Sequence, residues 1–168
     1  RLLMTYETER AMLTGWAEYM AAGQWDIVTG WNSNGFDFHY LYNRAKVLHI
    51  GDRMVLGAGS RAFHAQETTV TNAQKGTRKK VTVDLGGGSF AVCGMEACKD
   101  AYPQESSYAL DEFARQRLGR HKVEVLYDRI PLMMKTATGR YALAYYCETD
   151  AMLPLLILKK LTIIERLS

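Results

Sequence analysis

The stretch DIVTGWNSNGFDFHYLYNRAKVL, residues 26–48, places an apolar strand, a tight turn and a helix in immediate succession. DIVTGW, residues 26–31, is short, rich in β-branched residues and followed by turn residues, which indicates a buried strand. NSNG, residues 32–35, supplies the turn, and the apolar spacing that follows is helical. The carboxylate at the junction, Asp37, is therefore either a cap of this helix or a residue with a chemical role.

Further elements are indicated on both sides of this stretch. Residues 6–22 carry apolar side chains at helical spacing, and so do residues 107–119, which a glycine closes. Residues 140–161 are interpreted as another helix. We expect the last helix to be interrupted or kinked near Pro154. Residues 74–92 indicate two short strands around the glycine-rich turn GGGS. Strands mixed with covering helices indicate an α/β fold class.

The composition is that of an ordinary globular domain. The chain has 168 residues, 48% of them hydrophobic and 23% charged, which is enough for one domain with a sizeable core. A net charge of +3 permits a nucleic-acid partner without requiring one. The three cysteines lack the spacing of a zinc knuckle and are expected to be free thiols. No segment approaches the roughly 20 apolar residues that span a bilayer, so we expect no membrane partner.

A tyrosine and an aspartate share one face of the last predicted helix. Asp150 lies four residues after Tyr146, which places the phenol and the carboxylate side by side. A carboxylate can hold a divalent cation while a tyrosine hydroxyl orients a water molecule. An ordinary helix surface also explains this pair, and a helix N-cap explains Asp37, so spacing alone leaves both alternatives open.

Three blocks together resemble the 3′–5′ exonuclease domain of family B DNA polymerases. Residues 26–45 resemble the second exonuclease motif, in which an apolar strand leads through Gly-aromatic-Asn to Phe-Asp and then Tyr-Leu. Residues 145–161, YYCETDAMLPLLILKKL, resemble the third motif, Tyr-x-x-x-Asp followed by Leu-Pro-Leu. Residues 106–125, SSYALDEFARQRLGRHKVEV, resemble the segment before it, where Ser-Tyr-x-Leu leads to Leu-Gly and a lysine. Three blocks in the family's order are more specific than any one of them.

The resemblance implies a ribonuclease H-like (DnaQ-type) fold, with a mixed sheet and covering helices and incomplete at the N-terminus. It implies hydrolysis assisted by two divalent cations, Mg²⁺ or Mn²⁺. Asp150 would bind the cation that activates the attacking water, Tyr146 would hydrogen-bond that water, and Asp37 would serve the second cation. Asn32 and Phe36 match positions that contact the frayed single-stranded 3′ end of DNA.

The sequence also departs from the family pattern. The family's first exonuclease motif, Asp-x-Glu on a strand well upstream of the second, does not occur. Glu7 and Glu9 have a similar spacing, but they lie at the start of a predicted helix and are interpreted as exposed first-turn carboxylates. The carboxylate set is therefore incomplete, and we expect the chain alone not to cleave DNA. His39, where the family often has proline, is interpreted as a packed or surface histidine, because such sites use carboxylates.

Two further features have structural interpretations. GGGS, residues 86–89, lacks the lysine that follows in a phosphate-binding loop and is interpreted as a flexible turn. The basic run KGTRKK, residues 75–80, is interpreted as the solvated edge of a hairpin, and contact with a DNA backbone is the alternative.

Together these observations predict that residues 1–168 are part of the proofreading exonuclease domain of a replicative family B DNA polymerase. Residues 49–93 would form a β-rich insertion, and the polymerase domain is not included. The implied partners are primer-template DNA, the rest of the polymerase chain and a processivity factor. The sequence does not give the compartment: the nucleus and a viral replication site are both compatible with it, secretion is not expected, and the departures from cellular spacing are compatible with a viral polymerase. A free-standing exonuclease or ribonuclease of this fold and a non-catalytic DNA-binding or structural domain are the alternatives.

Overall fold

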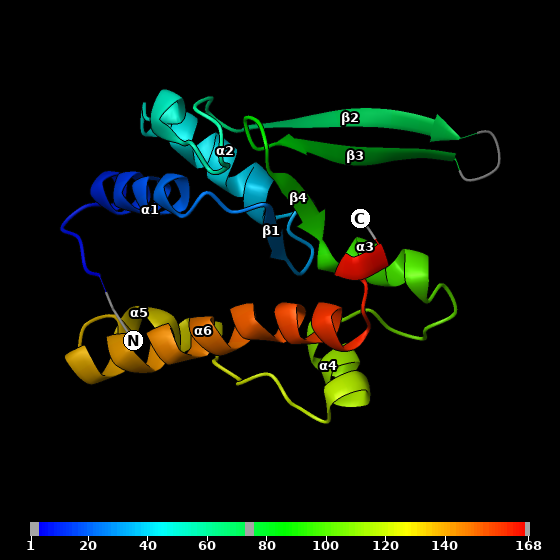
Figure 1. The fold of residues 1–168 in the computed structure, drawn as a ribbon. Helices are drawn as coiled ribbons and strands as arrows, with labels where there is room; N and C mark the ends of the chain where they lie inside the picture. The colour runs from blue at the N-terminus through cyan, green and yellow to red at the C-terminus, as the bar shows by residue number, and fades with distance from the viewer. Residues whose placement is uncertain (1–3, 73–75, 167–168) are drawn as a thin grey trace. The chain divides into compact units, whose positions relative to one another are not determined.

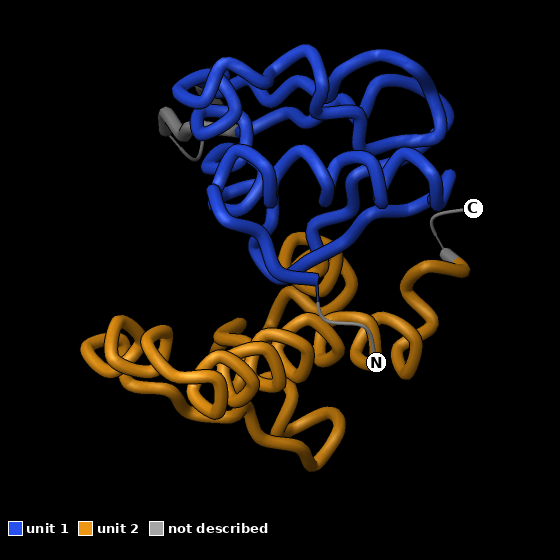
Figure 2. The backbone as a smooth tube through the Cα atoms, turned by 90° about the vertical axis from the view of Figure 1, so that its left-hand side faces the viewer, with its two compact units in different colours: residues 1–93 blue, residues 94–168 orange. Residues whose placement is uncertain are grey.

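The computed structural model describes residues 4–72 and 76–166. The chain divides into two compact units, Arg1–Cys93 and Gly94–Ser168, which Figure 2 colours separately. Each unit is described by itself.

The first unit combines helices with two pairs of strands (Figure 1). Its described elements are, in chain order, α1 (Glu9–Gly23), β1 (Ile27–Gly30), α2 (Asp37–Val47), a 3₁₀ helix (Gly51–Arg53), β2 (His64–Asn72), β3 (Gly76–Asp84) and β4 (Phe90–Cys93). β1 pairs in parallel with β4, with Ile27 opposite Phe90. Parallel pairing needs a long crossover, which the chain between the two strands supplies. β2 and β3 form an antiparallel pair with His64 opposite Asp84.

The α/β class predicted from the sequence is confirmed, but the predicted mixed sheet is wrong for the described residues. The parallel and the antiparallel pair are separate two-stranded sheets. The strands predicted around GGGS exist, yet they do not pair with each other, because β3 joins β2 and β4 joins β1. Gly86, Gly87 and Gly88 all have positive φ, and a Cβ atom on Gly86 would overlap the backbone of Arg61. These glycines redirect the chain from one sheet to the other.

The basic run at residues 75–80 cannot be assigned to either of its interpretations. Lys75 lies outside the described residues, and the side chains of Arg78, Lys79 and Lys80 are not among those described. The backbone from Gly76 onward belongs to β3.

The core of the first unit lies between α1, α2 and the chain that follows them. Leu13 and Ala17 point inward from α1, and Phe38 and Ala45 from α2, each pair at helical spacing. They join the buried side chains Ile50, Met54, Leu56, Phe63, Ala65 and Leu85. Burying a side chain such as Phe38 contributes about 1.5–3 kcal/mol to folding. The helix at whose first residue Asp37 lies is therefore anchored by its own apolar face.

An ion pair joins α1 to α2. Arg44 donates from Nε to Glu9 Oε1 at 2.6 Å and from a second nitrogen to the other carboxylate oxygen. Glu7 is exposed and Glu9 lies in the first turn of α1, as expected, but Glu9 is only partly exposed, at 36% of its side chain, because it pairs with Arg44. Glu9 is thus a structural link.

The second unit is helical in its described part (Figure 1). Its elements are α3 (Gly94–Ala101), α4 (Leu110–Leu118), a 3₁₀ helix (Tyr127–Arg129), α5 (Ile130–Met133), α6 (Ala137–Lys160) and a last 3₁₀ helix (Ile164–Arg166). α4 ends at Gly119, which adopts the left-handed conformation as the sequence predicts. α3, α4 and α5 all pack on α6. The core includes Phe113 and Ala114 of α4 together with Ile157 and Leu158 of α6.

The expected interruption of the last helix does not occur, since α6 runs through Pro154. Proline has no backbone N–H, so the carbonyl oxygen of Asp150, four residues earlier, loses its usual helical donor. Pro154 and its neighbour Leu153 are buried, and packing of this kind stabilises the helix despite the lost hydrogen bond. The proline therefore alters the backbone surroundings of Asp150 without ending the helix.

Two other features concern the cysteines and the apolar character of the helices. Cys93 and Cys98 are buried and Cys147 is exposed, and none of the three takes part in a disulfide within the described residues. None of the helices in the described ranges has both the length and the apolar character needed to cross a membrane.

Candidate functional site

Asn32 and Phe36 lie on the turn that connects β1 to α2. Asn32 adopts a positive φ of 58°, a conformation that asparagine tolerates better than most residues, and its carbonyl oxygen accepts the backbone N–H of Phe36 at 3.1 Å. A Cβ atom on Gly35 would approach Asn32 Oδ1 to 2.6 Å, so the glycine leaves room for the amide over the turn. Asn32 and Phe36 are both exposed. The turn therefore presents an amide and an aromatic ring to solvent.

Asp37 is the first residue of α2 and does not cap it. The cap position belongs to Phe36, and no side chain there bonds the helix N-terminus. The carboxyl group lies close enough to protein atoms that desolvation raises the pKa of Asp37, while a hydrogen bond from its own backbone N–H opposes the rise. The net direction is opposite to the simple expectation that the helix dipole favours the ionised form. A cation beside this carboxylate would favour its ionised form.

A second aromatic ring accompanies Phe36. The rings of Phe36 and Tyr40 are 64% and 55% exposed for their residues, nearly parallel at 8°, with centroids 6.1 Å apart. Residues four apart on a helix are neighbours, which explains the pairing. Asp37 is thus flanked on the same helical turn by two exposed aromatic side chains.

Tyr146 and Asp150 lie together on α6, as their spacing predicts, and Lys122 joins them. Lys122 Nζ lies 2.9 Å from Asp150 Oδ2, and the two side chains are 30% and 21% exposed. Lys122 Nζ also lies 5.4 Å from the centroid of the Tyr146 ring. A lysine, a phenol and a carboxylate therefore form one closed polar cluster on the second unit.

The charges in this cluster hold both proton donors in their protonated forms. Burial opposes the charge of Lys122, but its hydrogen bonds and charge interactions with Asp150 and Tyr146 prevail and raise its pKa. Burial is also the largest cause that raises the pKa of Tyr146, and its hydrogen bond to Asp150 adds to this while Lys122 opposes it. At neutral pH the cluster therefore offers an ammonium group and a neutral hydroxyl.

The two carboxylate oxygens of Asp150 differ in their hydrogen bonding. Oδ2 faces Lys122, whereas Oδ1 is buried and has no hydrogen-bond partner among the residues that the structure describes. Buried carboxylate oxygens without a partner are costly, and such an oxygen fits a hard cation that prefers oxygen ligands.

The predicted site residues fall into two groups. Asn32, Phe36 and Asp37 belong to the first unit, and Tyr146 and Asp150 belong to the second. Within the described ranges, the structure gathers no set of three or more His, Cys, Asp or Glu side chains that could hold a metal ion. The structure thus brings the members of each group together, and their catalytic and metal-binding roles stay predictions.

Lys122 is the member of the cluster that the sequence did not assign to a role. It stands in a segment without helical or strand periodicity, 24 residues before Tyr146 by their numbers. The one available signal was its place after Leu-Gly in the block that precedes the third motif.

Comparison with known proteins shows the family to which the chain belongs. Residues 2–112 match the family described as "DNA polymerase family B, exonuclease domain", and the chain belongs to this family. It is 32% identical over 158 residues, 93% of the chain, to the DNA polymerase delta catalytic subunit of Schizosaccharomyces pombe. It is 34% identical over 162 residues, 95% of the chain, to that of Oryza sativa subsp. japonica. It is 35% identical over 166 residues, 96% of the chain, to that of Glycine max.

The chain spans only 14% to 15% of the length of these relatives. The family predicted from the three blocks is confirmed, and a viral origin stays a prediction.

Proposed function

We propose that this chain is part of the 3′–5′ exonuclease that proofreads primer ends in a replicative DNA polymerase, with a ribonuclease H-like fold. The observation that carries the proposal is the cluster of Lys122, Tyr146 and Asp150, in which a buried carboxylate oxygen has no partner among the described residues. Membership of the family B exonuclease domain supports the same reaction class.

Asp37 and Asp150 would hold the divalent cations, Mg²⁺ or Mn²⁺. Their surroundings fit this role, because Asp150 keeps one buried oxygen unpartnered among the described residues and Asp37 is an exposed carboxylate in the first turn of α2, where the helix has no side-chain cap bond. When bound, two such cations stabilise the entering and leaving oxygens of an in-line displacement at phosphorus.

The other members of the cluster would orient the reactants. The neutral hydroxyl of Tyr146 holds the attacking water by a hydrogen bond, and the ammonium group of Lys122 stabilises negative charge that develops at the phosphate. Water oxygen bonds to the terminal phosphorus, the bond to the 3′ oxygen of the preceding nucleotide breaks, and that oxygen takes up a proton. The products are a nucleoside monophosphate and a primer shortened by one nucleotide.

Asn32 and Phe36 would hold the single-stranded 3′ end, the amide by polar contacts and the ring by packing on a base or sugar. A mispaired end frays at lower free-energy cost than a paired one, which supplies the selectivity. The substrate is then primer-template DNA, and the partners are the rest of the polymerase and a processivity factor. Because the sequence contains no Asp-x-Glu motif, we assign the activity to the full-length polymerase and not to this chain alone.

Site variants of the full-length protein test the proposal. Asp37→Ala and Asp150→Ala should each lower Mg²⁺-dependent trimming of a 3′-labelled single-stranded oligonucleotide by about a hundredfold or more, because each removes a charged ligand. The rate of primer extension should stay within about twofold of wild type, which corresponds to a change of well under about 1 kcal/mol in the activation free energy.

Asp52→Ala and Asp128→Ala are matched controls, since both carboxylates are exposed and lie outside the cluster. Trimming that is unchanged in both site variants would overturn the assignment.

A further inference from the structure

The segment that carries Lys122 has little structure of its own. It follows Gly119, where α4 ends in the left-handed conformation, and precedes the 3₁₀ helix that begins at Tyr127. No helix or strand includes Lys122. A long lysine side chain loses much rotamer freedom when it is held in one place, so its position depends on how firmly its backbone is fixed.

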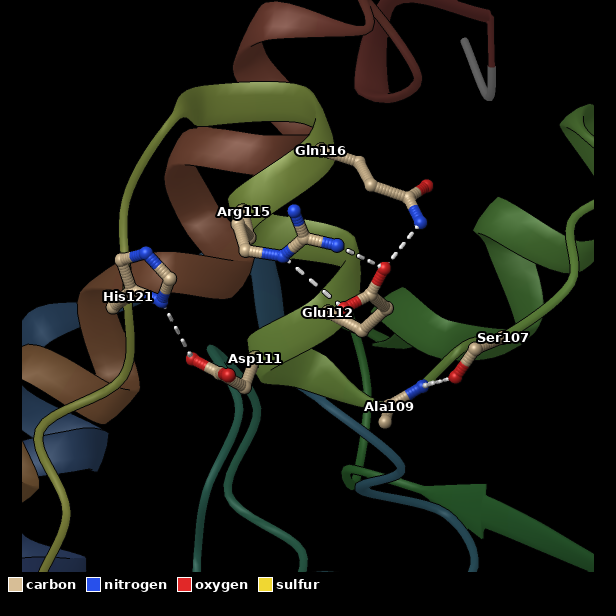
Figure 3. A network of polar contacts seen from close by, with 7 residues as sticks. All are labelled: Ser107, Ala109, Asp111, Glu112, Arg115, Gln116 and His121. Carbon is tan, nitrogen blue, oxygen red and sulfur yellow. Dashed lines mark hydrogen bonds and ion pairs between the residues drawn. The ribbon is translucent and has the colours of Figure 1, made fainter.

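One side chain fixes that backbone. The N–H of Lys122 donates to Asp111 Oδ1 at 2.7 Å, across 11 positions of sequence. The same oxygen lies 3.9 Å from His121 Nδ1, and Figure 3 shows the two side chains facing each other. Lys122 is therefore held at both ends, by Asp111 at its backbone and by Asp150 at its ammonium group.

Asp111 stands on a rigid support. It lies in the first turn of α4, whose Phe113 and Ala114 are fully buried where this helix packs on α6. α6 carries Tyr146 and Asp150. Asp111 therefore fixes the backbone of Lys122 relative to α4 and α6, and α6 carries the other two members of the cluster.

We propose that Asp111 is a positioning residue for Lys122 and, through it, for the trimming reaction. The inference rests on the proposed function, because Lys122 matters to the reaction only if its cluster acts on the phosphate. Asp111 touches neither substrate nor cation in this role. It keeps the ammonium group at Asp150 and Tyr146.

The structure offers a graded set of variants. Asp111→Ala removes the acceptor, whereas Asp111→Asn keeps an amide oxygen that can accept the same N–H. Glu112 is the matched control, since its carboxylate bonds Arg115 and Gln116 on its own helix (Figure 3). The side chain of Asp111 is 51% exposed, so its removal should not unfold the unit.

In the full-length polymerase, Asp111→Ala should lower kcat for trimming a single-stranded oligo(dT) by about tenfold, the effect of one hydrogen bond to a charged acceptor. KM for the oligonucleotide should stay unchanged, because Asp111 does not contact DNA. Asp111→Asn should restore kcat to within about twofold of wild type, and Glu112→Ala should not change it. In a Lys122→Met background, Asp111→Ala should cause no further loss.

A second measurement keeps the inference separate from the proposed function. Hydrogen exchange of the Lys122 amide should speed up in Asp111→Ala and stay slow in Asp111→Asn and Glu112→Ala. Exchange that stays slow in Asp111→Ala overturns the positioning role. The positioning role is also overturned if Asp111→Ala exchanges faster but trims at the wild-type rate. It is overturned as well if the loss of kcat in Asp111→Ala adds fully to the loss in Lys122→Met. If the variants show this exchange pattern but the wild-type polymerase does not trim the oligonucleotide, the proposed function is overturned instead.

Discussion

The two carboxylate oxygens of Asp150 have different surroundings. One accepts from Lys122 at 2.9 Å, and the other is buried without a partner among the described residues. The protein provides a partner for one of the two oxygens, and a bound cation would provide a partner for the other. The protein thus supplies one positive charge at the site and leaves an oxygen available for a second.

Replacing Lys122 by methionine tests this balance. Lys122→Met keeps the apolar stem but removes the charge that faces Asp150, so trimming should fall about ten- to a hundredfold. Stability should fall by about 1–2 kcal/mol, less than for a fully buried pair, because both side chains are partly solvated. Trimming assays and thermal unfolding of the full-length protein check both.

The pH dependence of this contribution has a definite sign. Because the pKa of Lys122 is raised in the folded protein, its stabilisation is fully present below the ordinary lysine pKa and is lost only as pH rises through the higher folded value. The stability difference between Lys122→Met and wild type should therefore be constant from pH 7 to pH 9. Lys99→Met, which changes an exposed lysine of α3, is the control. If Lys122→Met trims at the wild-type rate, the ammonium group has no role in the reaction.

The sequence predicts part of this site well. Tyr146 and Asp150 share a face because they lie four residues apart on one helix, a relation that local sequence spacing predicts. Lys122 is not predictable in this way, because it reaches the cluster from an irregular segment held by Asp111. Asp37 was open to a cap interpretation because Asp is a good cap residue, but the chain enters α2 one residue earlier, at Phe36.

At the scale of elements, the predictions fail where tertiary contacts replace local signals. α1, α2 and α4 are predicted because each has an apolar stripe. β2, HAQETTVTN, has few large apolar residues, and its strand depends on hydrogen bonds to β3, so the sequence gives little warning of it. α3, GMEACKDA, is short and directly follows β4. Pro154 predicts an interruption or a kink, and the helix continues through it without an interruption.

The ion pair between α1 and α2 is an element-scale feature with a testable consequence. The hydrogen bond from Arg44, with a smaller contribution from its charge, lowers the pKa of Glu9 in spite of desolvation. A lowered folded pKa gives stability that is present above the unfolded value and is lost as pH falls through the folded value. Arg44→Ala should therefore speed hydrogen exchange of the α1 amides at pH 7 and make little difference below the folded pKa of Glu9.

Arg10→Ala, which changes the exposed neighbour of Glu9 on α1, should leave this exchange unchanged at both pH values. Equal exchange in Arg44→Ala and wild type at pH 7 would show that the ion pair does not hold α1 in place.

At the scale of the whole molecule, the chain contributes two acidic positions in two compact units, and its sequence lacks the family's upstream Asp-x-Glu motif. It belongs to the family B exonuclease domain and covers about a seventh of the length of its polymerase delta relatives. The proposed catalytic roles of Asp37 and Asp150 therefore concern the full-length polymerase.

The most direct test of proofreading compares paired and mispaired primer ends on the same template. The full-length wild-type protein, supplied with Mg²⁺ and no nucleotides, should release nucleoside monophosphate from a mispaired 3′ end at least about tenfold faster than from a paired end, because unpairing costs less. Asp150→Ala should release it from neither. Equal release from both ends, or release that persists in Asp150→Ala, would contradict the account.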